Sequence, residues 1–449
     1  MESNPIKAEF SRLDLRRLIV PLVIEQLLAI TVGLCDSIMV AQVGEAAISA
    51  VSLVDTVNVL LVNAFAALAT GGAVIAGQYL GRREAEKAAH AGEQLLLFMG
   101  EASLLITVLF YLLRGFVLGV VFGQVEPDVA AYANTYYLIV EASTPFLAVY
   151  SAGAALFRVM GNSRISMWVS LGMNAVNVAG NAFLIFGLHM GVEGVAIPTV
   201  VSRVAAAAAM LVLLRRPGLP LRVGRVPLRN DRYVVKHILH FGVPNGLESG
   251  MFNLGKILLL STVSVLGTAS VTANAIGNAM ASFQCVAGNA LGLAIVTVVS
   301  RCMGAGSYEQ ARRYTKRLVK TTYLYMAGTI ALTLAALPLV LLLYNVSPET
   351  AAMAREVIWL HGLMATLIWP LSFTLPQALR AAGDTRYTLV VSSVSMWTFR
   401  VALGVLLGRY AGLGLLGVWL AMVLDWLARS ALFLHRFHGH KWETMGLEE

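Results

Sequence analysis

Long apolar stretches recur along the whole chain, separated by short polar segments. A helix that spans a membrane needs about 20 mostly apolar residues, and the stretches are long enough to form twelve such helices. They form two groups of six, at about 15–40, 50–76, 92–113, 130–157, 165–187 and 192–214, and then at 236–263, 272–299, 318–343, 352–379, 387–408 and 413–435. The pattern predicts an all-α polytopic membrane protein.

Lysine and arginine collect on alternate connections between these stretches, as they do in the cytoplasmic loops of membrane proteins. The connections between them are nearly free of basic residues, and Arg114 and Arg409 are the main exceptions. A wrong helix count would break this alternation, so we expect both termini to be cytoplasmic. The basic connections contain Arg82, Arg83 and Lys87; Arg158 and Arg164; the arginines of 215–235; Arg301, Arg312, Arg313, Lys316, Arg317 and Lys320; Arg380 and Arg386; and Arg436 and Lys441.

The segment 215–235 divides the chain. Its three prolines and several arginines are incompatible with a helix in hydrocarbon. We therefore expect an N-terminal six-helix lobe at 1–214, a cytoplasmic basic linker at 215–235, and a C-terminal six-helix lobe at 236–449.

The two halves are copies of one unit. Each has an even number of helices, so the second copy starts on the same side of the membrane as the first. The repeat is then parallel, with a pseudo-twofold axis along the membrane normal, and two lobes facing a central cleft suit transport by alternating access. The landmarks that recur at an offset of about 223 residues include Pro21 and Pro244, Glu25 and Glu248, Gly44 and Gly267, Ala50 and Ala273, Gly81 and Gly304, and Gly194 and Gly417.

Composition supports a lipid environment. The chain is 58% hydrophobic and 13% charged, whereas soluble domains carry about 25% charged residues. The net charge of +8 follows from the basic loops and does not require nucleic acid as a partner. The first apolar stretch is longer than the h-region of about 7–15 residues in a cleaved signal peptide, so we expect it to be retained as a helix.

Signatures of catalysis are missing from the sequence. It contains no Walker A motif, no HExxH, no GxSxG and no clustered histidines and cysteines. The three cysteines are too few and too scattered for a disulfide framework or a metal cluster. We therefore expect no enzymatic activity, no cofactor, and no metal other than Na⁺ as a candidate coupling ion.

Two glutamates follow prolines at equivalent places in the repeats. Glu25 and Glu248 each come four residues, about one helical turn, after Pro21 and Pro244, which should bend or break their helices. Freed carbonyls beside a carboxylate form a candidate proton or cation site. The alternative is that each carboxylate caps neighbouring backbone donors and holds the bend.

A further carboxylate and a row of amides lie deeper in the first half. Asn174, Asn177 and Asn181 fall on one helical stripe, and Asp36 is a carboxylate at bilayer depth, which costs at least about 2.5–3.5 kcal/mol. Together they offer the oxygens that bind a proton or a hard cation. The alternative for the asparagines is hydrogen bonding that holds helices together.

The second half has its own polar residues. We expect Lys256 to form an ion pair with Glu248 across a cavity, and Asp425 to pair with Arg429 one turn away. The residues predicted to line a substrate cleft are Asn253, Lys256, Asn274, Asn278 and Gln284.

At these landmarks the chain resembles the multidrug and toxic compound extrusion (MATE) family. The resemblance implies twelve helices in two lobes, a multi-pass protein of the cytoplasmic membrane that acts as a monomer, and export of small organic, often cationic, compounds against an inward H⁺ or Na⁺ gradient. The matching stretches are PLVIEQLLAITVGLCDSIMVAQVG (21–44), GQYLGRREAEKA (77–88), LFRVMGNSR (156–164), NAVNVAGNAFLIFG (174–187), GVEGVAIPT (191–199), GVPNGLESGMF (242–252) and LRAAGDTR (379–386).

The resemblance also implies roles for single residues. Pro21 matches the proline that bends the first helix, Asp36 the cation-binding aspartate, and Asn177 an ion-binding asparagine of the fifth helix. The chain departs from the pattern at Asn181, where many members have aspartate, and at 361–377, where the acidic residue of some members is missing.

Three functions remain for comparison. The first is the ion-coupled antiporter, and the second is a flippase for lipid-linked or polyprenyl-linked cargo, which often has extra helices or a strongly basic cavity. The third, a membrane enzyme, lacks a catalytic set. The few deep cations other than Arg429, namely Lys256, Arg203 and Arg400, favour the antiporter over the flippase.

Overall fold

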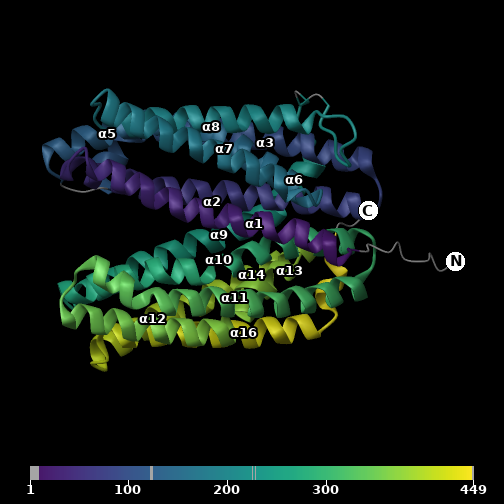
Figure 1. The fold of residues 1–449 in the computed structure, drawn as a ribbon. Coiled ribbons are helices and arrows are strands. Elements are labelled where there is room, and N and C mark those ends of the chain that lie inside the picture. Colours follow the sequence, from purple (N-terminus) through teal and green to yellow (C-terminus); the bar gives the residue numbers. More distant parts are fainter. Residues whose placement is uncertain (1–9, 122–124, 225, 228, 447–449) are drawn as a thin grey trace. The chain divides into compact units, whose positions relative to one another are not determined.

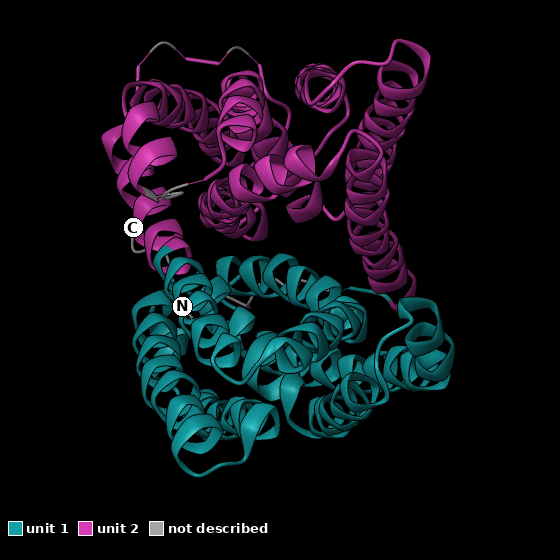
Figure 2. Cartoon of the chain, turned by 90° about the vertical axis from the view of Figure 1, so that its left-hand side faces the viewer, with its two compact units in different colours: residues 1–11, 247–449 teal, residues 12–246 magenta. Residues whose placement is uncertain are grey.

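The computed structural model describes residues 10–121, 125–224, 226–227 and 229–446, so residues 225 and 228 of the predicted linker lie outside it. Within these ranges every regular element is a helix (Figure 1), which confirms the all-α prediction. Contacts divide the chain into an N-terminal unit, Arg12–Gly246, and a C-terminal unit, Leu247–Glu449 with Met1–Ser11. Figure 2 colours the two units separately.

The N-terminal unit contains the first six predicted segments. The fourth is a bent pair, α5 and α6, whose axes meet at 47°. The elements are α1 Arg12–Ala41, α2 Glu45–Gly81, α3 Ala85–Leu112, α4 Arg114–Phe116, α5 Pro127–Glu141, α6 Thr144–Val159, α7 Ser163–Ala182 and α8 Glu193–Leu214, with π-helical turns η1 Val117–Val121 and η2 Phe183–Gly187.

The next helix, α9 Arg232–Ser264, begins in the N-terminal unit and ends in the C-terminal unit. The remaining elements are α10 Thr268–Gly304, α11 Tyr308–Tyr344, α12 Pro348–Trp369, α13 Leu375–Ala382, α14 Thr385–Ser395, α15 Leu403–Val405 and α16 Gly414–His438, with π-helical segments η3 Pro370–Thr374, η4 Met396–Ala402 and η5 Leu406–Tyr410, and a final 3₁₀ turn, η6 Lys441–Thr444.

Each predicted segment coincides with a helix or a run of adjoining helices. Among the described residues, ten helical stretches are long and apolar enough to cross a membrane, and the α5–α6 pair makes an eleventh. The one predicted segment left, 236–263, corresponds to α9. This helix is long enough but less apolar, because Glu248, Asn253 and Lys256 interrupt its hydrophobic residues.

The sequence repeat is also a repeat of local structure. Helices α2 and α10 each have 37 residues, and both their first and last residues are 223 positions apart. The π-helical turns η2 and η5 keep the same offset. Gly44 and Gly267, which precede α2 and α10, both have positive φ angles, 136° and 104°, a conformation that glycine adopts without strain.

Neither helix breaks at the proline that was expected to bend or break it, and the expected bends stay predictions. Helix α1 continues through Pro21 and α9 through Pro244. Pro21 has no N–H group, so the carbonyl of Arg17 lacks its helical donor. Ser163, the first residue of α7, fills this gap: its hydroxyl lies 3.2 Å from the Arg17 carbonyl oxygen and 2.7 Å from that of Leu18.

Each unit has its own hydrophobic core. In the N-terminal unit, residues of α1, α2, α5 and α8 pack around the fully buried Tyr137. In the C-terminal unit, Trp369, Trp419 and Trp426 are buried between α10, α12 and α16. Helices α7 and α8 lie side by side within the first unit, and α12 and α16 within the second (Figure 1).

Candidate functional site

A carboxylate on α1 faces two amides on α7. Asn181 donates from Nδ2 to Oδ1 of Asp36 across 2.9 Å. The Asn177 amide, in the orientation that satisfies both of its ends, donates to the two Asp36 oxygens at 3.0 and 3.3 Å and accepts from the Thr199 hydroxyl of α8 at 3.1 Å. Asn177 and Asn181 meet the same carboxylate because residues four apart share a helix face.

Asp36 is held by amides and not by a cation. It is half-buried, Asn177 is 7% exposed and Asn181 is fully buried. Within the ranges that the structure covers, no lysine, arginine or histidine forms an ion pair with Asp36. The buried Oδ1 of Asn181 has no hydrogen-bond partner there, so an amide oxygen remains available beside the carboxylate. Asn174, one turn earlier on the stripe, is half-buried.

A second carboxylate lies near the first. Tyr136 of α5 donates from its hydroxyl to Oδ1 of Asp55 on α2 at 3.3 Å, and Asp55 is close enough to Asp36 for their charges to interact. Arg203 of α8 donates to the Ser143 hydroxyl at 2.7 Å, and its charge also acts on Asp55. The polar layer of this unit therefore extends from α1 and α7 to α2, α5 and α8.

Sequence reasoning gave no role to three members of this layer. Asp55 carried a signal, since it is a carboxylate at bilayer depth. Thr199 closes the segment GVEGVAIPT, but a threonine in a helix has no distinctive signal by itself. Tyr136 could be recognised only from its contact.

Glu25 belongs to a different set of contacts. Its Oε1 lies 3.5 Å from Nη1 of Arg158, and its Oε2 accepts from the Ser166 hydroxyl at 2.9 Å. Both partners lie at the junction of α6 and α7. These contacts are with side chains of neighbouring helices, so the backbone cap that was the alternative interpretation of Glu25 stays a prediction.

Glu248 is paired in the same way in the second repeat. Arg380 donates to its Oε1 at 2.5 Å, and Nη2 of Arg429 lies 3.5 Å from the same oxygen. The predicted ion pair between Glu248 and Lys256 is therefore not formed, and that prediction is wrong. Two arginines, one on α13 and one on α16, form ion pairs with this carboxylate instead. Arg380 corresponds in the repeat to Arg158, so one ion pair occurs in both copies.

The expected pairing of Asp425 with Arg429 is also wrong. Asp425 accepts from the Ser395 hydroxyl at 2.6 Å, and its Oδ2 lies 3.7 Å from Nη1 of Arg400. Both partners come from the neighbouring 385–410 segment. At a buried position a contact across two packed helices replaces the local contact that spacing alone suggests.

The five residues predicted to line a substrate cleft have different environments. Lys256 is exposed and lies 5.0 Å from the centre of the Phe252 ring, Asn253 is partly buried, and Asn278 is exposed. The other two serve packing. Asn274 accepts from the Trp419 indole at 3.1 Å, and the fully buried Gln284 contacts His361 at 2.5 Å.

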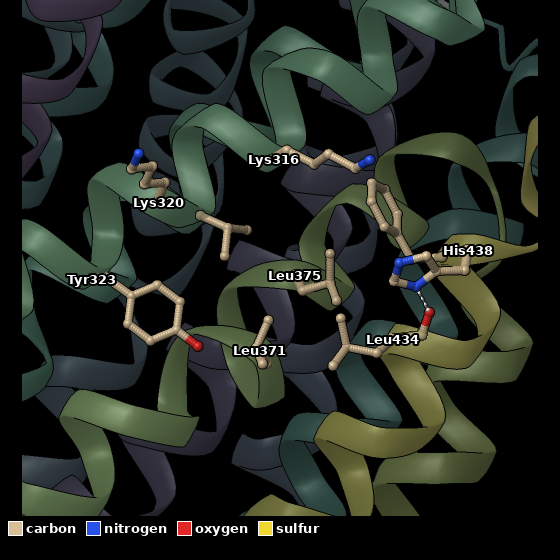
Figure 3. A pocket seen from close by; sticks show the side chains of 9 residues that line it. Lys316, Lys320, Tyr323, Leu371, Leu375, Leu434 and His438 are labelled. Atoms are coloured by element: carbon tan, nitrogen blue, oxygen red, sulfur yellow. Dashed lines mark hydrogen bonds between the residues drawn. The ribbon is translucent and has the colours of Figure 1, made fainter.

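A separate cavity of about 310 Å³ opens in the C-terminal unit. Its lining is mostly apolar, and Figure 3 shows Lys316 and Lys320 of α11 across from Leu434 and His438 of α16. Leu371 and Leu375 lie between the two helices (Figure 3).

The second repeat has no counterpart of the Asp36 site. Leu259 stands where the first repeat has Asp36, and Gly404 where it has Asn181. These two residues also touch, since a Cβ atom placed on Gly404 would lie 2.8 Å from a Leu259 methyl carbon. The repeats thus preserve the contact between helices and change its chemistry. No three His, Cys, Asp or Glu side chains converge on a metal position anywhere in the described part of the chain.

Comparison with protein families matches both halves of the chain. The model of the family described as MatE matches twice, at residues 21–183 and 244–406. The two matches begin 223 residues apart, which is the offset of the internal repeat.

Curated relatives match over nearly the whole chain. The chain is 25% identical to "Uncharacterized transporter YisQ" of Bacillus subtilis over 95% of its own length and 94% of the relative's. It is 26% identical to "Probable multidrug resistance protein NorM" of Thermotoga maritima, with 96% and 93% covered. It is 22% identical to "Multidrug and toxin extrusion protein 1" of Oryctolagus cuniculus, with 94% and 74% covered.

Solved structures share the fold. An outward-facing multidrug resistance MATE family transporter of the MOP superfamily superimposes with a TM-score of 0.88 at 18% identity, covering 95% of this chain and 96% of the other. An aspartate-to-asparagine mutant of the Vibrio cholerae MATE transporter VcmN gives a TM-score of 0.86 at 18% identity, covering 96% and 97%.

Proposed function

The chain belongs to the MatE family of multidrug efflux transporters, and from this premise we propose that it is an antiporter that exports small organic compounds in exchange for an inward ion. As a member of this family it is a membrane transporter and not an enzyme. The flippase hypothesis is not favoured, because curated relatives carry the names of multidrug resistance and extrusion proteins.

The observation that carries the proposal is that Asp36 contacts amides, whereas three other deep carboxylates contact arginines. Glu25, Glu248 and Asp425 each lie within 3.7 Å of an arginine nitrogen. A carboxylate fixed by an arginine is a poor exchanger of ions, because its charge is already compensated. Asp36 meets only neutral amides, so it can take up and release a cation.

We propose H⁺ as that cation. A hard cation such as Na⁺ is held by several oxygens, whereas the amides here direct nitrogens at Asp36. In addition, this chain has Asn181 where many family members have an aspartate, so it has one carboxylate fewer at this site. A proton needs only one carboxylate oxygen. On this view an external proton neutralises Asp36, which favours release of cargo outside, and loss of the proton to the cytoplasm resets the site. Asn174, at the start of the stripe, is proposed as a peripheral polar group.

We propose the cytoplasmic membrane as the location, with both termini in the cytoplasm and the monomer as the working unit. The support is the basic character of alternate connections. No cofactor is needed beyond the coupling ion. Among the residues predicted to line the cargo path, exposure favours Lys256, Asn253 and Asn278 over the buried Gln284.

Membrane lipid is the second proposed partner, at the cavity between α11 and α16. Lys316 and Lys320 are one turn apart near the start of α11, and the lining between them and Leu434 is mostly apolar. Basic pockets between membrane helices bind anionic headgroups, so a phospholipid fits this surface. Native mass spectrometry of a variant in which both lysines are glutamine should show less retained anionic lipid than the wild type.

Transport in proteoliposomes tests the antiporter, with pH and Na⁺ gradients imposed separately. Asp36→Asn should abolish gradient-driven efflux while the purified protein keeps its unfolding temperature. Asp128→Asn makes the same chemical change at an exposed position of α5 and should transport like the wild type. Wild-type efflux by Asp36→Asn would refute the assignment, and efflux driven by Na⁺ alone would refute H⁺ as the ion.

A further inference from the structure

Four cations on the helices of the C-terminal unit have only two carboxylates among their contacts. Lys256, Arg380, Arg400 and Arg429 face only Glu248 and Asp425 in the contacts described above. Arg380 and Arg429 share Glu248, and Asp425 is left for Arg400. Lys256 forms no ion pair with any carboxylate in the described ranges. An ionisable residue at membrane depth is costly unless it faces a cavity or a partner.

Arg400 is buried without full use of its donors. It is 8% exposed, and its Nε and Nη1 have no hydrogen-bond partner among the described residues. Its ion pair with Asp425 is loose, at 3.7 Å, because the other oxygen of that carboxylate is engaged by Ser395 at 2.6 Å. A guanidinium has five N–H donors, and leaving them unmet in a buried place costs free energy.

Lys256 and Arg400 lie close to one another around a single aromatic ring. The Lys256 ammonium is 5.0 Å from the centre of the Phe252 ring and the Arg400 guanidinium is 4.8 Å from it. The two charges are therefore less than about 10 Å apart. A ring face attracts a cation but does not neutralise it, so the two like charges repel. Lys256 is exposed, which leaves the pair accessible from one side.

We propose that Lys256 and Arg400 bind the carboxylate or sulfonate of an amphipathic organic anion whose apolar part lies on Phe252. This rests on the proposed export function and names the class of cargo. It departs from the cationic cargo that the family resemblance suggested, because the two charges around Phe252 are both positive. The unit's counterpart of Asn177 in the repeat is Arg400, so the second copy has a cation where the first has an amide.

A native thiol reports on this site. Cys285 of α10 is partly buried, and the charges of both Lys256 and Arg400 act on it. Cys302 is buried, and Cys35 lies on α1 in the other unit. A Cys35→Ser/Cys302→Ser background therefore leaves one informative cysteine.

The experiment measures labelling of Cys285 in detergent by two methanethiosulfonates of similar size, one with a sulfonate and one with a quaternary ammonium. The ratio of the labelling rate with the anionic reagent to that with the cationic reagent should be about tenfold higher at Cys285 than for a small free thiol in solution, equivalent to about 1.4 kcal/mol. Lys256→Gln should remove most of this preference. Arg400→Lys keeps the positive charge and should keep the preference for the anionic reagent. This variant serves as the test of Arg400 because it removes the need for Arg400→Gln to fold.

Competition identifies the ligand class. Naphthalene sulfonate should slow labelling in the wild type but not in Lys256→Gln, and a naphthyl trimethylammonium of the same size should not slow it. A preference for the cationic reagent, failure of both reagents to reach Cys285, or equal protection by chloride would each overturn the proposal. No gradient is used, so failure of coupling at Asp36 leaves this result unaffected.

Discussion

The hydroxyl of Ser163 lies in the gap that Pro21 leaves in the backbone hydrogen bonds of α1. It reaches the carbonyl oxygens of Arg17 at 3.2 Å and Leu18 at 2.7 Å. A carbonyl left without a donor away from water costs about 1–3 kcal/mol, so this one side chain stabilises a proline inside the first half of α1. It also fixes the start of α7, the helix whose later turns carry Asn177 and Asn181.

A double-mutant cycle should reveal this relationship. Ser163→Ala should lower the free energy of unfolding by about 1 kcal/mol, measured by thermal unfolding in detergent. In a Pro21→Ala background the restored N–H can bond to Arg17, so the same change should have little effect. The coupling energy should be about 0.5–1.5 kcal/mol. Equal losses in both backgrounds would show that Ser163 acts elsewhere.

Glu248→Gln should be strongly destabilising. It leaves Arg380 and Arg429 buried without their shared carboxylate, and breaking a buried pair in this way costs about 3–5 kcal/mol. Glu25→Gln should cost less, because its arginine is 3.5 Å away and Ser166 can still donate to the amide oxygen. The unfolding temperatures of the two variants provide the comparison. A larger loss for Glu25→Gln would contradict this account.

Asn181→Asp should increase the role of Na⁺. It adds carboxylate oxygens beside Asp36, and two adjacent carboxylates attract a cation more strongly than one. The ratio of Na⁺-driven to H⁺-driven efflux in proteoliposomes should rise about tenfold. The exchange variant Asp36→Asn/Asn181→Asp keeps a single carboxylate and should show no such rise. An equal rise in both variants would mean that the number of carboxylates is not the cause.

The C-terminal segment should detach in acid. Burial raises the pKa of Glu443, but hydrogen bonds from Arg312 and His440 lower it by more, so this pKa lies below its usual value. The contact therefore contributes stability above the unfolded value of about 4.3 and loses it as the pH falls through the lower folded value. Trp442, buried against Phe437, should become accessible with it.

Hydrogen exchange of residues 439–446, corrected for intrinsic rates, measures this release. Protection should be lost in acid in the wild type. In Glu443→Gln it should already be weak at neutral pH and should change little on acidification. If protection in Glu443→Gln depended on pH as it does in the wild type, a group other than Glu443 would control the release of this segment.

The membrane segments followed from the sequence because length and apolarity define them directly. Among the described helices, α9 is less apolar than the other long ones, since Glu248 and Lys256 dilute its apolar residues, and α5 and α6 are long enough only as a bent pair. The offset of 223 residues recurs in the structure, where α2 and α10 have equal length and begin 223 residues apart.

The partners of the charged residues were less accessible to sequence reasoning. Asp425 and Arg429 have ideal local spacing, yet they pair with Arg400 and Glu248 on other helices. Such choices depend on how helices pack, which spacing along one helix does not specify. The repeat held an unused signal, because Arg158 and Arg380 recur together with Glu25 and Glu248. Asp36 could be proposed because it is a carboxylate at bilayer depth, and Asn177 and Asn181 because they share one face of their helix.

The amides around Asp36 have a consequence for how the site responds to its own charge. A carboxamide that turns half a revolution presents oxygen where it presented nitrogen, with almost no change of shape. An ionised Asp36 needs donors, and a protonated one needs an acceptor for its new O–H. Asn177 and Asn181 can supply either by rotating in place. In the proposed H⁺ mechanism, these two amides would answer the arrival of a proton by turning before any helix moves, whereas the arginine-paired carboxylates have no such partner.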